Sequence, residues 1–233
     1  KMKKLMIAII VLMSSISLAS AELGVKIGMS ADLGTFSTSG SENEGGEVSV
    51  KKDAESLVGY GSFFIEKTLT FLPGPLGRLS VGYSYVPHDM KSGTASTHKN
   101  DLTGLTDSND DFETGDSNPV DQKIQVDFSN FNTLYATLNI TDWLYVKAGT
   151  MEIDLTTNED LGTGSTYGNT SLDGNSIGAG VHIAKDNGLF FRFEVNDQSF
   201  DGVKLTSTNN SANSVTITDL DGTTAKVSIG KAF

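Results

Sequence analysis

The sequence contains no cysteine, only three histidines and few basic residues. Without cysteine the chain forms neither disulfides nor thiolate metal sites. Lysine and arginine total 17 against 29 aspartate and glutamate residues, which gives a formal net charge of −12. Nucleic-acid binding needs basic patches. We therefore expect no nucleic-acid partner for a chain this acidic.

Long apolar runs are also missing after residue 21, so no membrane-spanning helix is expected there. Residues 1–21 show the pattern of a secretory signal peptide. Three lysines give a positive start, Leu5–Leu12 forms an apolar core, and Ala19–Ala21 is an Ala-x-Ala cleavage site. The alternative, a membrane anchor, is disfavoured because the apolar stretch is shorter than the roughly 20 residues that a spanning helix needs.

Cleavage after Ala21 would remove three lysines and no acidic residue. The remaining 14 basic and 29 acidic residues give a net charge of −15. The length of the segment 22–233 suits one domain. We predict a signal peptide over 1–21 and a single domain over 22–233.

That domain contains eight segments in which apolar residues alternate with polar or small ones. The alternation in Leu23–Gly34 is strict over about a dozen positions, where an ordinary strand has about five or six residues. A tilted strand that crosses a membrane needs about 9–11 residues. If the domain is a membrane barrel, the lipid-facing sets are Leu23, Val25, Ile27, Met29, Ala31 and Leu33; Phe63, Ile65, Leu69 and Phe71; Leu79, Val81, Tyr83 and Tyr85; Ile124, Val126, Phe128, Leu134, Ala136, Leu138 and Ile140; Leu144, Val146, Ala148, Met151, Ile153 and Leu155; Ile177, Ala179, Val181 and Ile183; Leu189, Phe191, Phe193 and Val195; and Ala225, Val227, Ile229, Lys231 and Phe233.

Two of the eight segments are irregular. Asn130 and Asn132 interrupt the fourth, which predicts a β-bulge there. In the fifth segment the apolar set slips by one position between Ala148 and Met151, which predicts a second bulge.

The connections between the segments alternate in length. Tight turns are expected at residues 72–77, 141–142 and 185–188, and long polar stretches at 36–47, 88–122, 156–175 and 197–222. Outer-membrane barrels have short periplasmic turns and long external loops, and an even number of strands returns both termini to the turn side. The short alternating pieces Val203–Thr206 and Val215–Thr218 are predicted to be extensions of the seventh and eighth strands that form a hairpin beyond the membrane; ten spanning strands is the alternative.

These features resemble the small OmpA/OmpX-type outer-membrane barrels. The last strand ends on Phe233, with Ile229 and Val227 at alternate positions before it. In that family a terminal aromatic residue is the signal read by the barrel-assembly machinery, although Lys231 departs from the usual hydrophobic residue. The resemblance covers the whole domain in pattern and includes no diagnostic motif.

The resemblance implies an all-β fold, namely an eight-stranded antiparallel up-and-down transmembrane β-barrel with short periplasmic turns and long extracellular loops. It implies an integral protein in the cell outer membrane of a Gram-negative bacterium. The expected partners are outer-membrane lipid and lipopolysaccharide, and the assembly machinery through Phe233. A soluble barrel, with the apolar face inward, is the competing interpretation.

With apolar stripes facing outward, charges of both signs would face the interior. They are Lys26, Asp32, Arg78, Lys147, His182, Arg192, Glu194 and Lys226. An eight-stranded barrel is only just wide enough for its own side chains, and buried charges must pair or be solvated. We predict a plug of salt bridges and water rather than an open pore.

The stretch Asp101–Asp121 within the second long connection is rich in acidic residues. A divalent-cation site is one hypothesis, because hard cations take carboxylate oxygens. Asp107–Asp111 superficially resembles a calcium loop, but Phe112 and Asn118 stand where such a loop needs Gly and a closing Glu. A solvated acidic loop is the favoured interpretation, and we predict no metal site and no cofactor.

A catalytic site is not indicated either. His88, Asp89 and Ser92 lie together at the external end of the third strand, but a triad is defined by spatial geometry. His182 lies near the opposite end, and His98 has no placed partner. We predict no catalytic residue and no enzyme.

The predicted function is a non-enzymatic surface barrel, structural or mediating adhesion or interaction with an extracellular ligand or phage through its acidic loops. The first alternative is a narrow porin-like conduit for small solutes. A lipid-modifying enzyme is the less favoured alternative.

Overall fold

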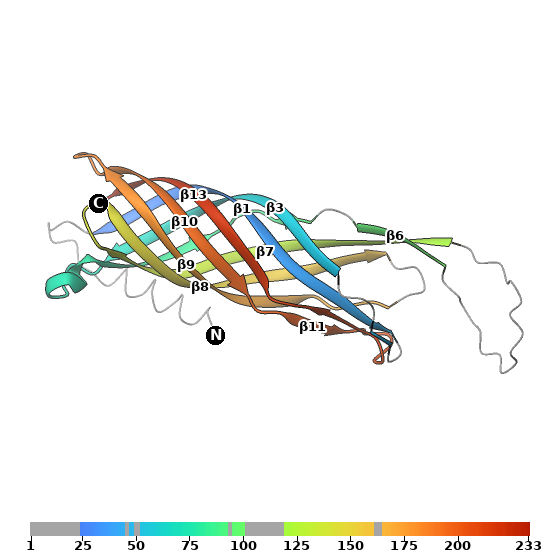
Figure 1. Cartoon of the computed structure of the whole chain (residues 1–233). Helices are drawn as coiled ribbons and strands as arrows, with labels where there is room; N and C mark the ends of the chain where they lie inside the picture. The colour runs from blue at the N-terminus through green and yellow to red at the C-terminus, as the bar shows by residue number, and fades with distance from the viewer. Residues whose placement is uncertain (1–23, 45–46, 49–51, 93–94, 101–118, 161–164) are drawn as a thin grey trace, which may run out of the picture.

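The computed structural model describes residues 24–44, 47–48, 52–92, 95–100, 119–160 and 165–233. Within them, eight long strands form a closed barrel: β1 (Val25–Glu44), β3 (Lys52–Thr68), β4 (Leu79–Tyr85), β7 (Pro119–Asn139), β8 (Leu144–Asp160), β9 (Thr170–Ala184), β10 (Leu189–Phe200) and β13 (Leu220–Ala232). Each pairs antiparallel with the next, and β1 pairs with both β13 and β3, which closes the barrel (Figure 1). The predicted eight-stranded antiparallel barrel is confirmed.

One end of the barrel, which we call the turn end, carries the tight connections. The 3₁₀ helix η1 (Gly74–Arg78) lies between β3 and β4, and Lys185–Gly188 joins β9 to β10. Gly188 takes a positive φ of 82° in that turn, a conformation that glycine adopts without steric cost. The amide of Phe233 donates to the carbonyl of Val25 at 2.8 Å, so β13 ends beside the start of β1. The predicted tight turns are confirmed.

At the opposite end, the rim end, the strands run further than the sequence suggests. β1 continues to Glu44, β8 continues to Asp160, and β9 begins at Thr170. Much of the predicted loops 36–47 and 156–175 is therefore strand, because polar strands that stand clear of an apolar phase lose the alternation that marks them.

Shorter strands extend the rim end. β5 (Met90–Lys91) and β6 (Ala95–Asn100) pair with β7, and β2 (Glu47–Val48) pairs with β1. β11 (Val203–Thr206) and β12 (Ser214–Ile217) pair with each other, which confirms the predicted hairpin. β12 also pairs with β1 at Gly40–Asn43, which holds the hairpin against the barrel.

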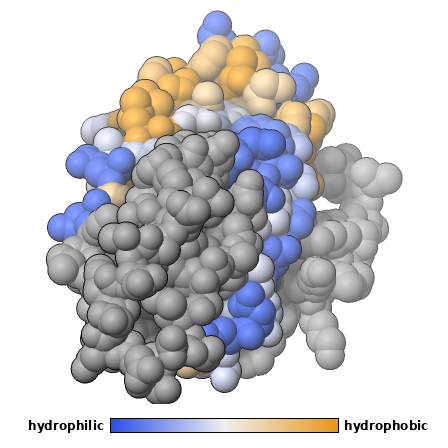
Figure 2. All heavy atoms as spheres, turned by 90° about the vertical axis from the view of Figure 1, so that its right-hand side faces the viewer, coloured by the Kyte–Doolittle hydropathy of each residue, from blue (hydrophilic) through white to orange (hydrophobic). Residues whose placement is uncertain are grey.

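Apolar side chains cover the outside of the barrel wall. On β10, Phe193 and Val195 are 53% and 59% exposed, while Glu194 and Asn196 between them are buried. The outward stripes predicted on β1, β9, β10 and β13 are confirmed by the same alternation. Figure 2, which looks at the rim end, shows hydrophilic residues there and hydrophobic residues gathered along the upper wall. An apolar belt around a closed barrel with a polar interior is the surface of a barrel that spans a membrane.

No helix among the described residues reaches the length and hydropathy of a membrane-spanning segment.

The bulge predicted on the fourth strand is confirmed. The pairing of β7 with β8 shifts by one residue between Ser129 and Asn132, and Asn130 takes a positive φ of 53°. One extra residue reverses the facing of everything beyond it. Val126 and Phe128, predicted to face lipid, therefore pack inside against the buried core.

The second predicted bulge is wrong. β8 pairs with β9 in unbroken register from Leu144 to Leu155. Its inward residues pass without a slip from Tyr145 and Lys147 to Met151 and beyond. What changes is the polarity of the interior: Met151, Ile153 and Leu155 were predicted on the lipid side and are buried inside the barrel.

Candidate functional site

The interior of the barrel is layered along its axis. The inward residues of β10 show the order from the turn end to the rim end: Phe190, Arg192, Glu194, Asn196, Gln198 and Phe200. Arg192 and Glu194 belong to a layer of charged side chains, which we call the ionic layer. Asn196 and Gln198 lie next toward the rim end, and Phe200 belongs to an apolar layer beyond them. These layers decide what the interior can hold.

Glu66 is at the centre of the ionic layer and is fully buried. Arg192 donates to both of its carboxylate oxygens, Nη1 to Oε2 at 2.7 Å and Nη2 to Oε1 at 2.9 Å. Lys26 Nζ donates to Oε1 at 2.9 Å. β3 and β10 are three strands apart around the barrel. The bidentate salt bridge between Glu66 and Arg192 therefore crosses the lumen.

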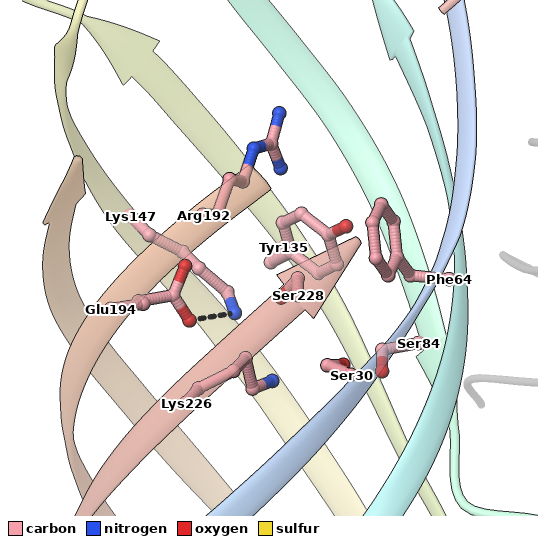
Figure 3. Close-up of a pocket in the computed structure, with 9 residues that line it drawn as sticks. All are labelled: Ser30, Phe64, Ser84, Tyr135, Lys147, Arg192, Glu194, Lys226 and Ser228. Carbon is pink, nitrogen blue, oxygen red and sulfur yellow. Dashed lines mark hydrogen bonds and ion pairs between the residues drawn. The ribbon is translucent and has the colours of Figure 1, made fainter. Parts of the chain in front are cut away.

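A second ion pair lies beside the first. Lys147 Nζ donates to Glu194 Oε1 at 2.8 Å, and the Tyr145 hydroxyl donates to Oε2 of the same carboxylate at 2.8 Å. Further along, Lys226 Nζ lies 3.3 Å from Asp32 Oδ1. Figure 3 shows the Lys147–Glu194 contact, with the side chains of Lys226 and Arg192 near it inside the barrel.

Interior glycines make room for the aromatic rings of this layer. A Cβ on Gly82 would lie 2.4 Å from Cζ of Tyr135, and one on Gly180 would lie 2.6 Å from Cζ of Tyr145. The Tyr135 ring also receives Lys147 Nζ 4.5 Å from its centroid. A tyrosine on one strand therefore fills the space that glycine leaves on the next.

Little open space remains in the ionic layer. Two voids there measure about 10 Å³ each, one beside Lys147, Arg192 and Glu194 and the other beside Tyr60 and Gln198. Such a volume holds about one water molecule. The described side chains close the lumen at this level.

The predicted interior charges are in place with one exception and one omission. Arg78 lies at the end of η1, is 52% exposed and faces an Asp142 that is 97% exposed, so its predicted interior position is wrong. A residue in a turn does not follow the alternation of a strand. The interior set also missed Glu66, although the alternation of β3 opposes it to Phe63 and Ile65. His182 is interior as predicted, and its Nδ1 accepts from Arg192 Nε at 3.2 Å.

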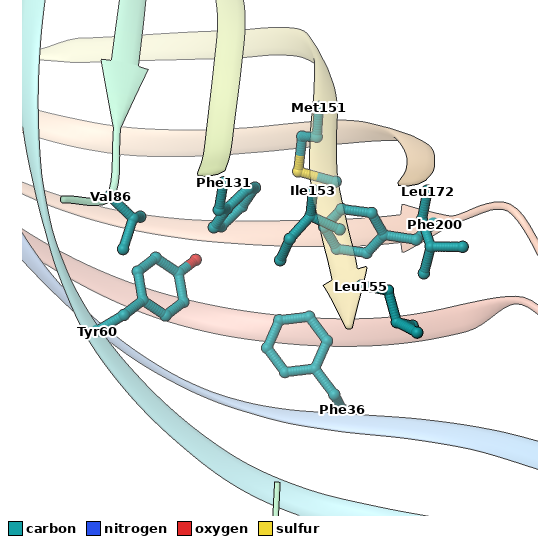
Figure 4. Packing of buried hydrophobic residues seen from close by; sticks show 9 residues of the cluster. All are labelled: Phe36, Tyr60, Val86, Phe131, Met151, Ile153, Leu155, Leu172 and Phe200. Atoms are coloured by element: carbon teal, nitrogen blue, oxygen red, sulfur yellow. The ribbon is translucent and has the colours of Figure 1, made fainter. Parts of the chain in front are cut away.

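Between the ionic layer and the rim end, the interior of the barrel is largely apolar. Its buried core consists of Phe36, Tyr60, Val86, Phe131, Met151, Ile153, Leu155, Leu172 and Phe200 (Figure 4). The Phe131 ring packs edge-on against Tyr60 and Phe200, with centroids 5.4 Å and 5.7 Å apart. The predicted plug of salt bridges is therefore present only in the part of the lumen nearer the turn end, and the part nearer the rim end is apolar.

A cavity of about 480 Å³ opens within this apolar part, and we call it the rim chamber. Its inner wall includes Phe36, Phe131, Ile153 and Phe200. Its other wall is formed by residues 54–60 of β3 and residues 88–92. Ligand sites are commonly apolar clefts of about 300–1,000 Å³ with a few polar groups, so the rim chamber is the candidate site.

The residues considered as a triad line the rim chamber without forming one. His88 Nε2 accepts the amide of Gly61 at 3.1 Å, and its Nδ1 lies 3.3 Å from the Asp89 carbonyl. The Ser92 hydroxyl accepts the amide of Val126 at 2.8 Å. The His88 nitrogens thus face backbone groups rather than a serine hydroxyl and a carboxylate.

The acidic stretch that was considered as a cation site lies largely outside the described residues, including Asp107–Asp111. Within the described part, no three His, Cys, Asp or Glu side chains come together as a metal site would require. The predicted signal peptide at 1–21 also lies outside the described residues and stays a prediction.

The class that this architecture defines is a closed eight-stranded antiparallel barrel with an apolar exterior and a charged interior. No protein-family model matches the sequence, and no curated protein matches it. The fold is similar to that of solved barrels from outer membranes. The outer membrane protease OmpT from Escherichia coli is 11% identical, with 95% of this chain and 100% of that chain covered and a TM-score of 0.47.

Two further solved barrels show the same kind of likeness. The outer membrane protein OprG from Pseudomonas aeruginosa is 12% identical over 91% of this chain and 97% of that chain, with a TM-score of 0.40. Neisserial surface protein A (NspA) is 9% identical over 92% of this chain and 100% of that chain, with a TM-score of 0.38. The class-level resemblance expected from the sequence agrees with the closed antiparallel barrel of the structure. The likenesses to solved barrels concern the fold alone.

Proposed function

We propose that the chain is an integral barrel of a Gram-negative outer membrane that is closed to solutes and acts at the cell surface through its rim end. The observation that carries the proposal is the ionic layer, in which Glu66 of β3 is joined across the lumen to Arg192 of β10. A wide diffusion channel needs about sixteen strands, and this barrel has eight long strands among its described residues. Binding at the rim, rather than transport through the lumen, is the activity that this interior supports.

Single-channel recording in planar bilayers tests closure. The wild-type barrel should give no stable conductance, and the double variant Glu66→Ala with Arg192→Ala should give small openings, because it removes the pair that bridges the lumen. A stable wild-type conductance would favour the narrow conduit instead.

Under the same proposal the turn end lies in the periplasm and the rim end at the cell surface, because outer-membrane barrels have short periplasmic turns and long extracellular loops. An epitope tag inserted between Asp107 and Asp111 should be stained by antibody on intact cells, and one inserted after Asp186 should be stained only after permeabilisation. The reverse pattern would overturn the orientation.

Deletion of Asp101–Asp121 should leave the barrel assembled and abolish any binding that depends on the acidic loop.

The remaining partners follow from this location. We propose that outer-membrane lipid and lipopolysaccharide surround the belt and that Phe233 is read by the assembly machinery. The Phe233 ring is half-exposed, with Lys231 Nζ 5.6 Å from its centroid. Phe233→Ala should lower the amount of heat-modifiable barrel in the membrane, while Phe71→Ala, an exposed aromatic of the turn end, should not.

A further inference from the structure

The barrel wall separates at one place between β3 and the chain that follows β4. β4 pairs with β3 only over Phe63–Thr68. Beyond Tyr85 the chain follows β7 instead: the Val86 amide donates to Phe131 and the Ser92 amide to Val126. From Lys52 to Ser62, β3 pairs among the described residues with β1 alone.

The separation has a specific contact at its base. The amide of Gly61, the first residue beyond Ser62 toward the rim, donates to His88 Nε2 at 3.1 Å. In contact with lipid, a backbone amide without a partner costs several kcal/mol. The His88 ring therefore satisfies the first amide that the missing strand would have paired.

The rim chamber reaches the outside of the barrel through this separation. It is lined by seven consecutive residues of β3, from Ala54 to Tyr60. Successive residues of a strand face opposite sides of the sheet, so only a space that passes around the strand edge can touch all of them. Leu57 is 67% exposed on the outside and Tyr60 is 7% exposed on the inside. The chamber is open sideways.

The opening lies at the outer limit of the apolar belt. Leu57 pairs with Thr35, the residue at which the outward stripe of β1 turns from apolar to polar after Leu33. The exposed residues of the chamber lining include the acidic Glu55, the polar His88 and the basic Lys91, whereas the inner wall is apolar. A molecule that matches this arrangement has an apolar tail and one polar head.

The volume of the chamber is sufficient for an alkyl tail. A methylene takes up about as much space as a water molecule, whose share of the liquid is about 30 Å³. The chamber of about 480 Å³ therefore has room for at least one chain on the order of sixteen carbons. The ionic layer, on the turn-end side of the chamber, stops a tail from passing further along the lumen.

We propose that the rim chamber binds the tail of a single-chain amphiphile, which enters sideways from the outer leaflet between β3 and residues 86–92 and leaves its head at the mouth. This site goes beyond the proposed surface function and shares with it two premises, the insertion of the belt in a membrane and the outward orientation of the rim end.

Photo-crosslinking in phosphatidylcholine nanodiscs tests the proposal. The probe is hexadecanoic acid with a diazirine in the middle of its chain, and labelled residues are mapped by mass spectrometry. Labels are expected on the inner wall, at Phe131, Ile153 or Phe200, and also on the belt, at Ile177 or Phe193. Belt labels without inner labels would overturn this inference alone, whereas absence of belt labels would overturn membrane insertion itself.

Variants locate the bound tail. Val58→Trp fills the chamber from β3 and should lower inner labelling about tenfold, the effect of losing roughly 1.4 kcal/mol of binding, while belt labelling stays. Val195→Trp, the same change on the lipid side of β10, should alter neither. If Val58→Trp gives no heat-modifiable barrel, Leu57→Trp at the mouth takes its place. Unchanged inner labelling in the chamber variant would contradict the site.

A second probe tests whether the tail in the chamber belongs to a single-chain molecule or to a two-chain phospholipid. Phosphatidylcholine that carries the same diazirine should label the belt only, because the proposed site takes a molecule with one chain. Inner labelling by this lipid at the level given by the fatty acid would overturn the assignment to single-chain molecules.

Discussion

At the scale of single residues, the barrel depends on charges that are almost fully buried: the side chains of Glu66, Arg192 and Lys26 are 0%, 7% and 13% exposed. Glu66 forms ion pairs with both Arg192 and Lys26, and all three side chains lie inside the barrel. Removal of one partner from a buried pair leaves the other charge uncompensated, at a cost of about 3–5 kcal/mol. An exposed pair gives little, because water and salt screen it.

Glu66→Ala should therefore lower the free energy of unfolding by about 3–5 kcal/mol, measured by urea titration of the barrel in lipid vesicles. Asp142→Ala breaks the exposed contact with Arg78, 3.7 Å long, and should change little. Equal effects of the two changes would contradict the buried position of Glu66.

Gly82 offers a second test at this scale. Its missing side chain leaves the space that the Tyr135 ring fills, and overpacking a filled interior costs about 1–3 kcal/mol. Gly82→Ala should destabilise the barrel by that amount in the same titration. Gly59→Ala is the control, because its Cβ would meet Leu33 at an ordinary 3.6 Å; a stable Gly82→Ala barrel would show that Tyr135 does not occupy this place.

At the scale of elements, the bulge of β7 decides which residues reach the rim chamber. Asn130 holds the left-handed conformation that starts the register shift. Asparagine and glycine accept this conformation more readily than β-branched residues do. The bulge turns Phe128 inward, where it lines the chamber.

Asn130→Gly should thus be tolerated, and Asn130→Val should cost about 1–3 kcal/mol from backbone strain. Deletion of Asn130 should do more, because either Phe128 or Tyr135 would then face the wrong side. The heat-modifiable shift on gels measures assembly for all three. Normal assembly of the deletion variant would mean that the shift in register has no structural role.

Sequence alternation predicted the outward stripes of β1 and β10 because a membrane barrel imposes a period of two on its lipid face. It misplaced Met151, Ile153 and Leu155 for a physical reason. A bulge and a change in interior polarity both produce an apolar set that slips by one position, and only the register with the neighbouring strand separates them. The bulge at Asn130 was predictable because two asparagines interrupt that strand.

The candidate site lay beyond such reasoning. The rim chamber exists because residues 86–92 leave β3 and follow β7, a choice of strand partner that no local pattern encodes. His88 was singled out as a possible catalytic group, yet its ring nitrogens face the backbone of Gly61 and Asp89.

At the scale of the whole molecule, the belt, the ionic layer and the rim chamber form one arrangement. Lipid outside permits apolar stripes, charges inside close the lumen near the turn end, and the apolar part near the rim end has a sideways opening. Each of these depends on the apolar stripes facing outward.

Spin-label accessibility along β10 tests that orientation most directly. The native chain has no cysteine, so single cysteines at Phe193, Glu194, Val195 and Asn196 can each carry a label in a bilayer. Labels at Phe193 and Val195 should be open to oxygen, which concentrates in lipid, and labels at Glu194 and Asn196 should be shielded from both oxygen and a water-soluble nickel complex. Nickel access at Phe193 and Val195 would contradict the account, because it would place the apolar stripes in water.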